Sequence, residues 1–236
     1  MSNGTLYLIP TIIAEDTQTQ VIPEQVKRVL PSIRYFIVED ARTARRYLSS
    51  LKIYDSIESL HIDVLDKDNT ANQLKDLFTP IFDGHNLGVL SESGCPGVAD
   101  PGALAARFAH DHGIIVVPLV GPSSILMALM SSGLNGQHFA FHGYLPVEAK
   151  ESARVIKEFE RESRLKNQTQ IFIETPYRNN NIFAYLKANL GDQTLLCVAS
   201  DITGSTEFIK TQSVKKWKES KVEWKKVPTV FLLLAS

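Results

Sequence analysis

The sequence contains few cysteines, no long hydrophobic run and almost no net charge. Its two cysteines, Cys95 and Cys197, are too far apart for a paired metal-ligand motif. No segment approaches the roughly 18 apolar residues of a membrane span, and the N-terminus has no signal pattern. The net charge of −1 excludes a generally basic, nucleic-acid-coating protein. We therefore expect a cytoplasmic protein with no membrane contact, no disulfide and no metal site, whose nucleic-acid contacts come only from local patches.

The first half of the 236-residue chain alternates short apolar runs with helical periodicity. This βα alternation predicts an α/β fold with a mainly parallel sheet covered by helices on both faces. The expected strands are 6–11, 35–38, 61–65, 87–90 and 114–118, and the expected helices are 23–30, 41–51, 70–82, 103–112 and 125–132.

The second half has fewer helices per strand, which favours a mixed sheet with antiparallel pairing. We expect strands at 139–145, 169–174, 193–199, 207–212 and 229–235, with helices at 149–164, 180–189 and 214–218. The glycines and asparagine of 133–136 suggest a boundary. We predict an N-terminal domain over 1–120 and a C-terminal domain over 121–236, linked around 119–136, with a ligand cleft between them.

The most informative segment is 91–102, which joins an expected strand to an expected helix and contains three glycines and two prolines. Such loops at the carboxyl end of a parallel strand bind ligands in open α/β sheets. Asp100 can accept a hydrogen bond from an amine or hydroxyl, and the Asp100-Pro101 pair resembles the first turn of a helix. A single loop of this kind is about as often a purely structural turn as a ligand-binding one.

A second loop of this kind, 120–124, follows the next strand and ends in Ser123 and Ser124. The carboxyl ends of parallel strands lie at one edge of the sheet, so the two loops should share a pocket. Neither serine lies in a G-x-S-x-G elbow, which disfavours a serine hydrolase.

Charged residues elsewhere leave alternatives open. Glu39 and Asp40 could hold a ribose or cap the next helix. The ribose role in a dinucleotide-binding fold requires a glycine-rich turn after the first strand, and this sequence has no such turn. An arginine group on that helix is a solvated face or a phosphate patch. A group of lysines interleaved with Trp217 and Trp224 could grip nucleic acid or solubilise an edge. The arginines are Arg42, Arg45 and Arg46, and the lysines are Lys215, Lys216, Lys218, Lys221, Lys225 and Lys226.

Three side chains of the second half are candidates for proton transfer or charge stabilisation. Glu174 and Arg178 follow an expected strand, where they could act on a ligand or form a plain ion pair. His142 lies in an expected strand, where a structural role is more common than catalysis.

Seven segments, in order and spacing, resemble the tetrapyrrole-methylase-like superfamily of S-adenosylmethionine-dependent methyltransferases. Within it the chain is most similar to the family of ribosomal small-subunit RNA 2′-O-ribose methyltransferase I. The loop 91–102 and the turn 121–124 are the most specific; the others are 4–8, 39–42, 132–134, 141–146 and 174–178.

The resemblance implies a two-domain α/β protein, commonly a homodimer, with S-adenosylmethionine in the cleft and small-subunit ribosomal RNA as substrate. It does not say which of Glu174, Arg178 and His142 is catalytic, so all three stay candidates. The residues that it implies for the cofactor are Pro10, Ser91, Ser93, Gly94, Gly97, Val98, Ala99, Asp100, Ser123, Ser124, Thr175 and Ala199.

Three segments depart from the family pattern: 9–14, 145–148 and 199–204. The last two lose cations that would contact RNA phosphates. Two alternatives therefore stand beside the leading hypothesis: methylation of a tetrapyrrole or other small molecule, and cofactor binding without turnover.

Overall fold

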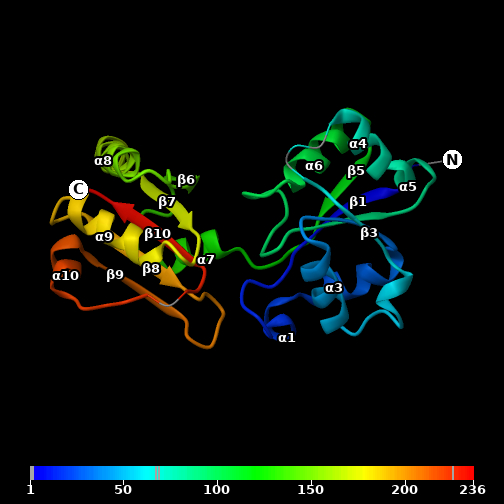
Figure 1. The fold of residues 1–236 in the computed structure, drawn as a ribbon, viewed down its shortest axis with the longest axis horizontal. Coiled ribbons are helices and arrows are strands. Elements are labelled where there is room, and N and C mark those ends of the chain that lie inside the picture. Colours follow the sequence, from blue (N-terminus) through cyan, green and yellow to red (C-terminus); the bar gives the residue numbers. More distant parts are fainter. Residues whose placement is uncertain (1–2, 67, 69, 225) are drawn as a thin grey trace. The chain divides into compact units, whose positions relative to one another are not determined.

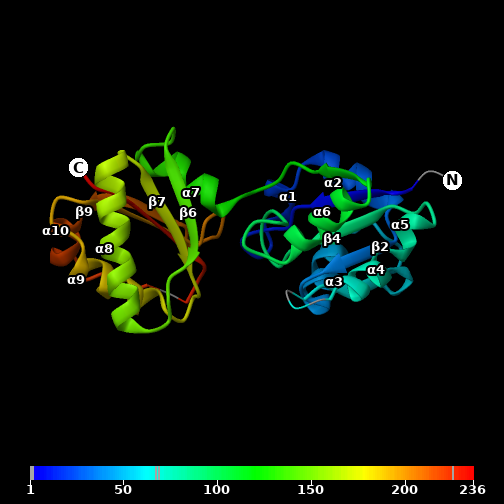
Figure 2. The same cartoon turned by 90° about the horizontal axis from the view of Figure 1, so that it is seen from above.

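The computed structural model describes residues 3–66, 68, 70–224 and 226–236, and the chain forms two compact units. The first unit spans Met1–Ser123 and the second spans Ser124–Ser236. Each has its own sheet and its own core (Figures 1 and 2).

The first unit is built on a five-stranded sheet in the order β3-β2-β4-β1-β5. All of its strand pairs are parallel, as the βα alternation predicts. This order places β1 between β4 and β5, so that the loops after these two strands lie on either side of the end of β1. The strands are β1 Thr5–Ile9, β2 Tyr35–Val38, β3 His61–Val64, β4 Leu87–Leu90 and β5 Ile115–Pro118.

Helices cover both faces of this sheet (Figure 1). One core cluster joins the sheet to α2, η1 and α3, with Val26, Leu30 and Leu48 fully buried. The other joins it to α4, α5 and α6 around Phe78 and Ile81. The elements are α1 Gln18–Val21, α2 Glu24–Val29, η1 Leu30–Ser32, α3 Ala41–Ser50, η2 Ile57–Ser59, α4 Ala71–Leu77, α5 Thr79–Phe82 and α6 Gly102–Asp111.

The second unit contains the predicted mixed sheet, in the order β6-β7-β10-β8-β9. β6 pairs with β7 in parallel, and the remaining neighbours are antiparallel. The strands are β6 Phe139–Tyr144, β7 Thr169–Glu174, β8 Leu195–Ser200, β9 Phe208–Ser213 and β10 Thr229–Leu234.

Two different groups of helices cover the faces of the second sheet. Phe172 and Phe231 pack with Ile156, Phe183 and Trp217 under α8, α9 and α10. The opposite face packs against α7, through Ala128 and Leu129. The helices are α7 Ser124–Ser132, α8 Ala149–Lys166, α9 Asn179–Asn189 and α10 Val214–Glu219.

Two local expectations are wrong in detail. The helix expected over 70–82 divides at Phe78 into α4 and α5, because Pro80 cannot donate the backbone hydrogen bond that a continuous helix needs. The Asp100-Pro101 pair does not cap α6 as expected: the N-cap residue is Pro101, with no side-chain cap bond. Asp40, by contrast, caps α3 by accepting a hydrogen bond from Thr43 N at 2.6 Å.

A close approach at the carboxyl edge of the first sheet requires glycine. A Cβ atom at Gly121 would lie 2.1 Å from Pro10 Cβ and 2.3 Å from Pro10 Cγ. Gly121 therefore lets the loop after β5 pack directly against the residue that follows β1.

We expect Gly121→Ala to destabilise the first unit by about 2 kcal/mol, because the added methyl overpacks this contact. Urea unfolding monitored by hydrogen exchange of peptides from residues 3–66 measures the change. Gly136→Ala is the control, since a Cβ there meets nothing within 4 Å. Equal stability of the Gly121→Ala variant and the native chain would contradict the contact.

Candidate functional site

The loop 91–101 and the loop 119–123 meet the end of β1, as their positions in the sequence predict. Thr11 N donates to Gly94 O at 2.8 Å, which joins the end of β1 to the loop after β4. The Cys95 thiol lies 3.3 Å from Pro122 O, which joins that loop to the one after β5. Three loop segments that are distant in the sequence are thus fixed at one edge of the sheet.

Asp100 closes the loop after β4. Its Oδ1 accepts from Gly97 N at 2.8 Å and from Gly102 N at 2.7 Å. Gly102 must be glycine for this, because a Cβ there would lie 2.8 Å from the same oxygen. The carboxylate therefore binds its own loop with one oxygen, in place of the helix cap that the sequence suggested.

The second carboxylate oxygen of Asp100 is buried and has no hydrogen-bond partner. Burial raises the pKa of Asp100, and the two backbone donors offset only part of that rise. A buried acceptor without a donor is costly. A ligand hydroxyl or ammonium group at this oxygen would remove that cost.

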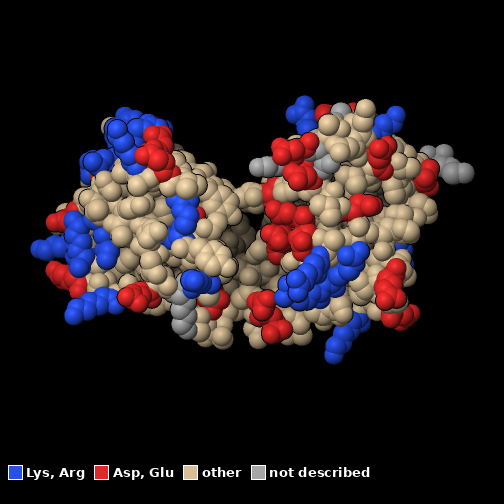
Figure 3. Space-filling model, in the orientation of Figure 1, with Lys and Arg blue, Asp and Glu red and all other residues tan. Residues whose placement is uncertain are grey.

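Asp100 is one of the residues that line an open hollow of about 600 Å³, together with Glu39, Leu65, Asp66 and Ala99. We call this the acidic hollow; Figure 3 shows acidic side chains gathered on this unit. The pKa of Glu39 is raised, first by burial and further by the negative charges of Glu92, Asp100 and Asp40. Such a site favours cationic or hydroxyl-bearing ligands and repels phosphate.

The other loop residues of the proposed cofactor set differ in accessibility. Ser93, Val98 and Ala99 are exposed, whereas Ser91 and Gly94 are buried. The Ser91 hydroxyl donates within the loop, to Ser93 O at 3.2 Å. The backbone is left-handed at Gly94 (φ 74°), Gly97 (φ 85°) and Ala99 (φ 63°), and the last is unusual for a side chain with a Cβ.

The serine pair spans the division between the units: Ser123 ends the first and Ser124 begins α7 of the second. Thr175 and Ala199 lie near the ends of β7 and β8, which are both neighbours of β10. Roles for these residues in cofactor binding stay predictions.

Glu174 and Arg178 form an ion pair, the plainer of the two alternatives. Arg178 Nη1 lies 3.2 Å from Glu174 Oε2, and the Glu174 side chain is completely buried. Glu174 Oε1 accepts from Thr175 N at 2.7 Å, and Arg178 also donates to Pro146 O at 2.8 Å. The pair therefore fixes Thr175 and the turn after β6.

His142 has the contacts of a structural residue. Its ring stacks on Phe159 of α8 at 4.0 Å, and its Nε2 lies 2.6 Å from Gln170 Oε1. These partners hold His142, a residue of β6, against α8 and β7, whereas Glu174 lies at the far end of β7 from Gln170.

The tryptophans among the C-terminal lysines are core residues. Trp217 is fully buried and donates through Nε1 to Leu196 O at 2.9 Å, and Trp224 is 7% exposed. Hydrophobic packing uses both rings, so neither is available to stack on nucleic-acid bases. The choice between a nucleic-acid grip and a solubilised edge stays open for the lysines, of which Lys225 lies outside the described residues.

Two features of the site were not predicted. Glu39 shares the acidic hollow with Asp100, because β2 lies beside β4 in the sheet. The buried Tyr47 hydroxyl donates to Pro10 O at 2.8 Å. Neither contact leaves a local signal in the sequence, because each joins residues more than 35 positions apart.

The fold is that of the tetrapyrrole methyltransferases. The methyltransferase CobJ matches 99% of this chain and 100% of its own with a TM-score of 0.63, at 13% sequence identity. Uroporphyrin-III C-methyltransferase from Thermus thermophilus matches 98% of this chain and 92% of its own with a TM-score of 0.56, at 15% identity.

By sequence, the chain is a relative of the ribosomal RNA small subunit methyltransferase I proteins. It is 29% identical to that of Escherichia coli O157:H7, over 88% of this chain and 68% of the relative. It is 30% identical to that of Streptococcus pyogenes serotype M6, over 84% of this chain and 64% of the relative. The chain thus spans about two thirds of the length of these curated relatives. No protein-family model matches it.

We expect Asp100→Asn to gain stability relative to the native chain as the pH rises. Asparagine keeps an Oδ1 acceptor for both amides but carries no charge. The pKa of Asp100 is raised above the ordinary 3.8 on folding, so the native chain loses stability as the pH rises from that value through the raised one. Thermal midpoints of both proteins between about pH 3.5 and 6 test the sign. A difference independent of pH contradicts it.

We expect Arg178→Met to destabilise the second unit by about 3 kcal/mol, because it leaves the buried Glu174 carboxylate unpaired. The double variant Glu174→Gln/Arg178→Met should lose less. Both tryptophans lie in this unit, so their fluorescence during urea unfolding reports it alone. Additive losses in the double variant would show that the two side chains are not coupled.

Proposed function

We propose that the chain is an S-adenosylmethionine-dependent methyltransferase that methylates a ribose hydroxyl of small-subunit ribosomal RNA. One observation carries the proposal: a buried, unpartnered carboxylate oxygen at Asp100, in a loop fixed to the end of β1. The relatives are named for ribosomal RNA methylation, which favours that acceptor over the tetrapyrroles of the fold neighbours.

The residues of the first unit fit this cofactor. Asp100 Oδ2 would accept from a hydroxyl or ammonium group of the ligand, and the acidic hollow complements its positive charge. Gly97 leaves room for close backbone approach, because a Cβ there would meet only Ala103 N, at 3.8 Å. When bound, the cofactor supplies a methyl group activated by a sulfonium centre.

The second unit contributes positioning residues in this proposal. Glu174 Oε1 accepts from Thr175 N, and Oε2 lies 3.2 Å from Arg178 Nη1 in an ion pair, although it is buried and makes no hydrogen bond. We assign to Glu174 and Arg178 the orientation of Thr175. The chemistry then rests mainly on holding the acceptor hydroxyl in line with the methyl group.

We infer further that the protein acts as a cytoplasmic homodimer. Met130 of α7 is 83% exposed and Leu126, one turn earlier, is 51% exposed, which supports an apolar contact on this helix. Among the described residues, no helix has both the length and the apolarity to cross a bilayer.

Two measurements on the same preparations test the function. Calorimetry with S-adenosylhomocysteine measures cofactor binding, and transfer of labelled methyl to small ribosomal subunits lacking this modification measures turnover. We expect Asp100→Asn to weaken binding about tenfold or more, through loss of a hydrogen bond to a charged acceptor. The exposed Asp76→Asn on α4 is the control.

Each outcome distinguishes one alternative. Binding without transfer to any ribosomal substrate supports a binding protein without turnover. Transfer to a tetrapyrrole in preference to RNA supports the small-molecule alternative. Absence of cofactor binding by the native chain overturns the proposal.

A further inference from the structure

A second hollow in the first unit lies between the loop after β1 and helix α3. Its volume is about 290 Å³. We call it the α3 pocket; Ile12, Ile13, Gln18, Thr43, Arg46 and Tyr47 line it. It also touches Ser91 and Glu92 at the start of the loop after β4. It is thus a neighbour of the acidic hollow, but none of the residues lining one lines the other.

The α3 pocket has an apolar part, formed by Ile12, Ile13, Ala44 and Tyr47, and a charged part that includes Glu15, Asp16 and Glu92 beside Arg46. Tyr47 is 4% exposed, and its hydroxyl is held by Pro10 O. Ala44 is buried beside it on the same helix, and the two isoleucines form the facing wall. This volume is near the lower end for small-molecule pockets, which suits one flat heterocycle better than an extended ligand.

Gln18 gives the pocket a recognition group. Its Oε1 atom is buried and has no hydrogen-bond partner, and Gln18 is one of the residues that line the cavity. A glutamine amide presents an acceptor and a donor side by side, which matches the donor and acceptor pattern on the edge of a nucleobase. Leaving such an acceptor unpaired costs stability, so a ligand edge that donates to it would bind favourably.

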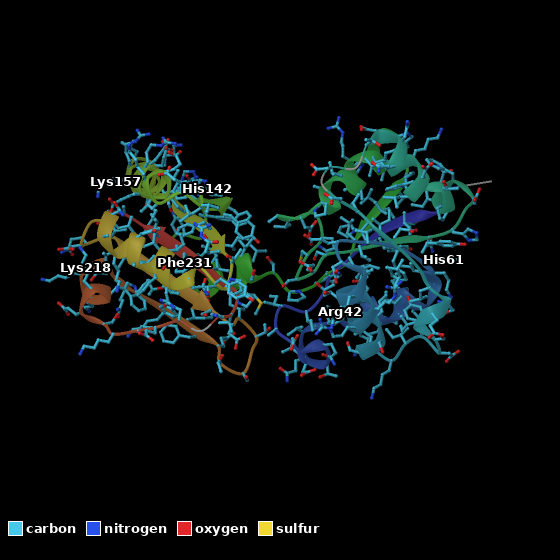
Figure 4. All side chains as sticks on the ribbon, viewed as in Figure 1. Arg42, His61, His142, Lys157, Lys218 and Phe231 are labelled. Carbon is cyan, nitrogen blue, oxygen red and sulfur yellow. The ribbon has the colours of Figure 1, made fainter. Side chains whose placement is uncertain are left out.

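Arg46 places a positive charge at the pocket. Its Nη1 lies 3.3 Å from Glu15 Oε1, but both side chains are largely exposed, at 65% and 85%. An exposed pair of this kind contributes little, so the guanidinium can exchange Glu15 for a phosphate. Exposed Arg42 lies on the same helix (Figure 4).

We propose that the α3 pocket binds the base of a nucleotide turned out of the RNA chain, with Gln18 reading its edge and Arg46 holding its phosphate. Single-stranded bases are recognised in this way by stacking and edge contacts. The inference rests on the proposed function, because that function supplies RNA as the substrate. It adds where the acceptor nucleotide is held.

Isoleucine-methyl NMR tests the pocket directly. Titration with cytidine 5′-monophosphate and adenosine 5′-monophosphate should shift the methyl signals of Ile12 and Ile13, assigned by Ile→Val variants, and leave that of Ile62 on β3 in place. Ribose 5-phosphate, which lacks a base, should shift them far less. No response of Ile12 and Ile13 overturns the proposal.

Matched variants separate the two contacts. Gln18→Leu should weaken nucleotide binding about tenfold, whereas Gln20→Leu on the same helix should not. Arg46→Gln should weaken the monophosphates but not the nucleosides, and exposed Arg28→Gln on α2 should weaken neither. Equal effects of the Gln18 and Gln20 variants overturn the assignment.

The same samples distinguish this inference from the proposed function. Saturation with S-adenosylhomocysteine should leave nucleotide binding intact; displacement of the nucleotide would assign the pocket to the cofactor and overturn the proposal. If the cofactor binds and its methyl group is transferred, but the NMR signals of Ile12 and Ile13 do not shift with nucleotides, only this inference fails. If nucleotides bind but the cofactor does not, the methyltransferase proposal fails and the nucleotide pocket stands.

Discussion

The two hydrogen bonds that Asp100 Oδ1 accepts from Gly97 and Gly102 are the contact on which the site depends. They close the loop after β4 and fix the carboxyl group, so that the other oxygen is left buried without a donor. If both carboxylate oxygens of Asp100 accepted hydrogen bonds from the loop, neither would remain to bind a ligand. Burial of this group raises its pKa in the folded chain, and the two backbone hydrogen bonds offset only part of that rise.

Much of the fold could be predicted because its signals are local. Strands β2, β4 and β7 match the expected segments residue for residue, since each is a short apolar run bounded by polar or glycine residues. The break at Phe78 was missed because the helical periodicity continues through it, and periodicity outweighed Pro80 in the prediction. Which strand lies beside which is non-local, and that order decides which loops meet.

The candidate site likewise has features that the sequence predicts and features that depend on the order of the strands. The glycine-rich loop and the serine turn could be found from composition alone. Their junction at Pro10 needs the order β4-β1-β5, and the entry of Glu39 into the acidic hollow needs β2 beside β4. The contacts of His142 with Phe159 and Gln170 could not be predicted from the sequence either. A histidine in a strand has the same sequence pattern whether its role is structural or catalytic.

Charge explains why an RNA-modifying protein of this kind would use two hollows. In the proposed function the acidic hollow would hold the cofactor, and its carboxylates would repel the phosphates of a nucleic-acid backbone. A ribose can approach only if its phosphates stay outside and find cations there. The α3 pocket offers apolar side chains for the base and the exposed Arg46 for a phosphate, although Glu15, Asp16 and Glu92 also line it. A chain whose 25 lysines and arginines are balanced by 26 acidic residues can thus act on a polyanion, provided that a cation lies where one nucleotide is held.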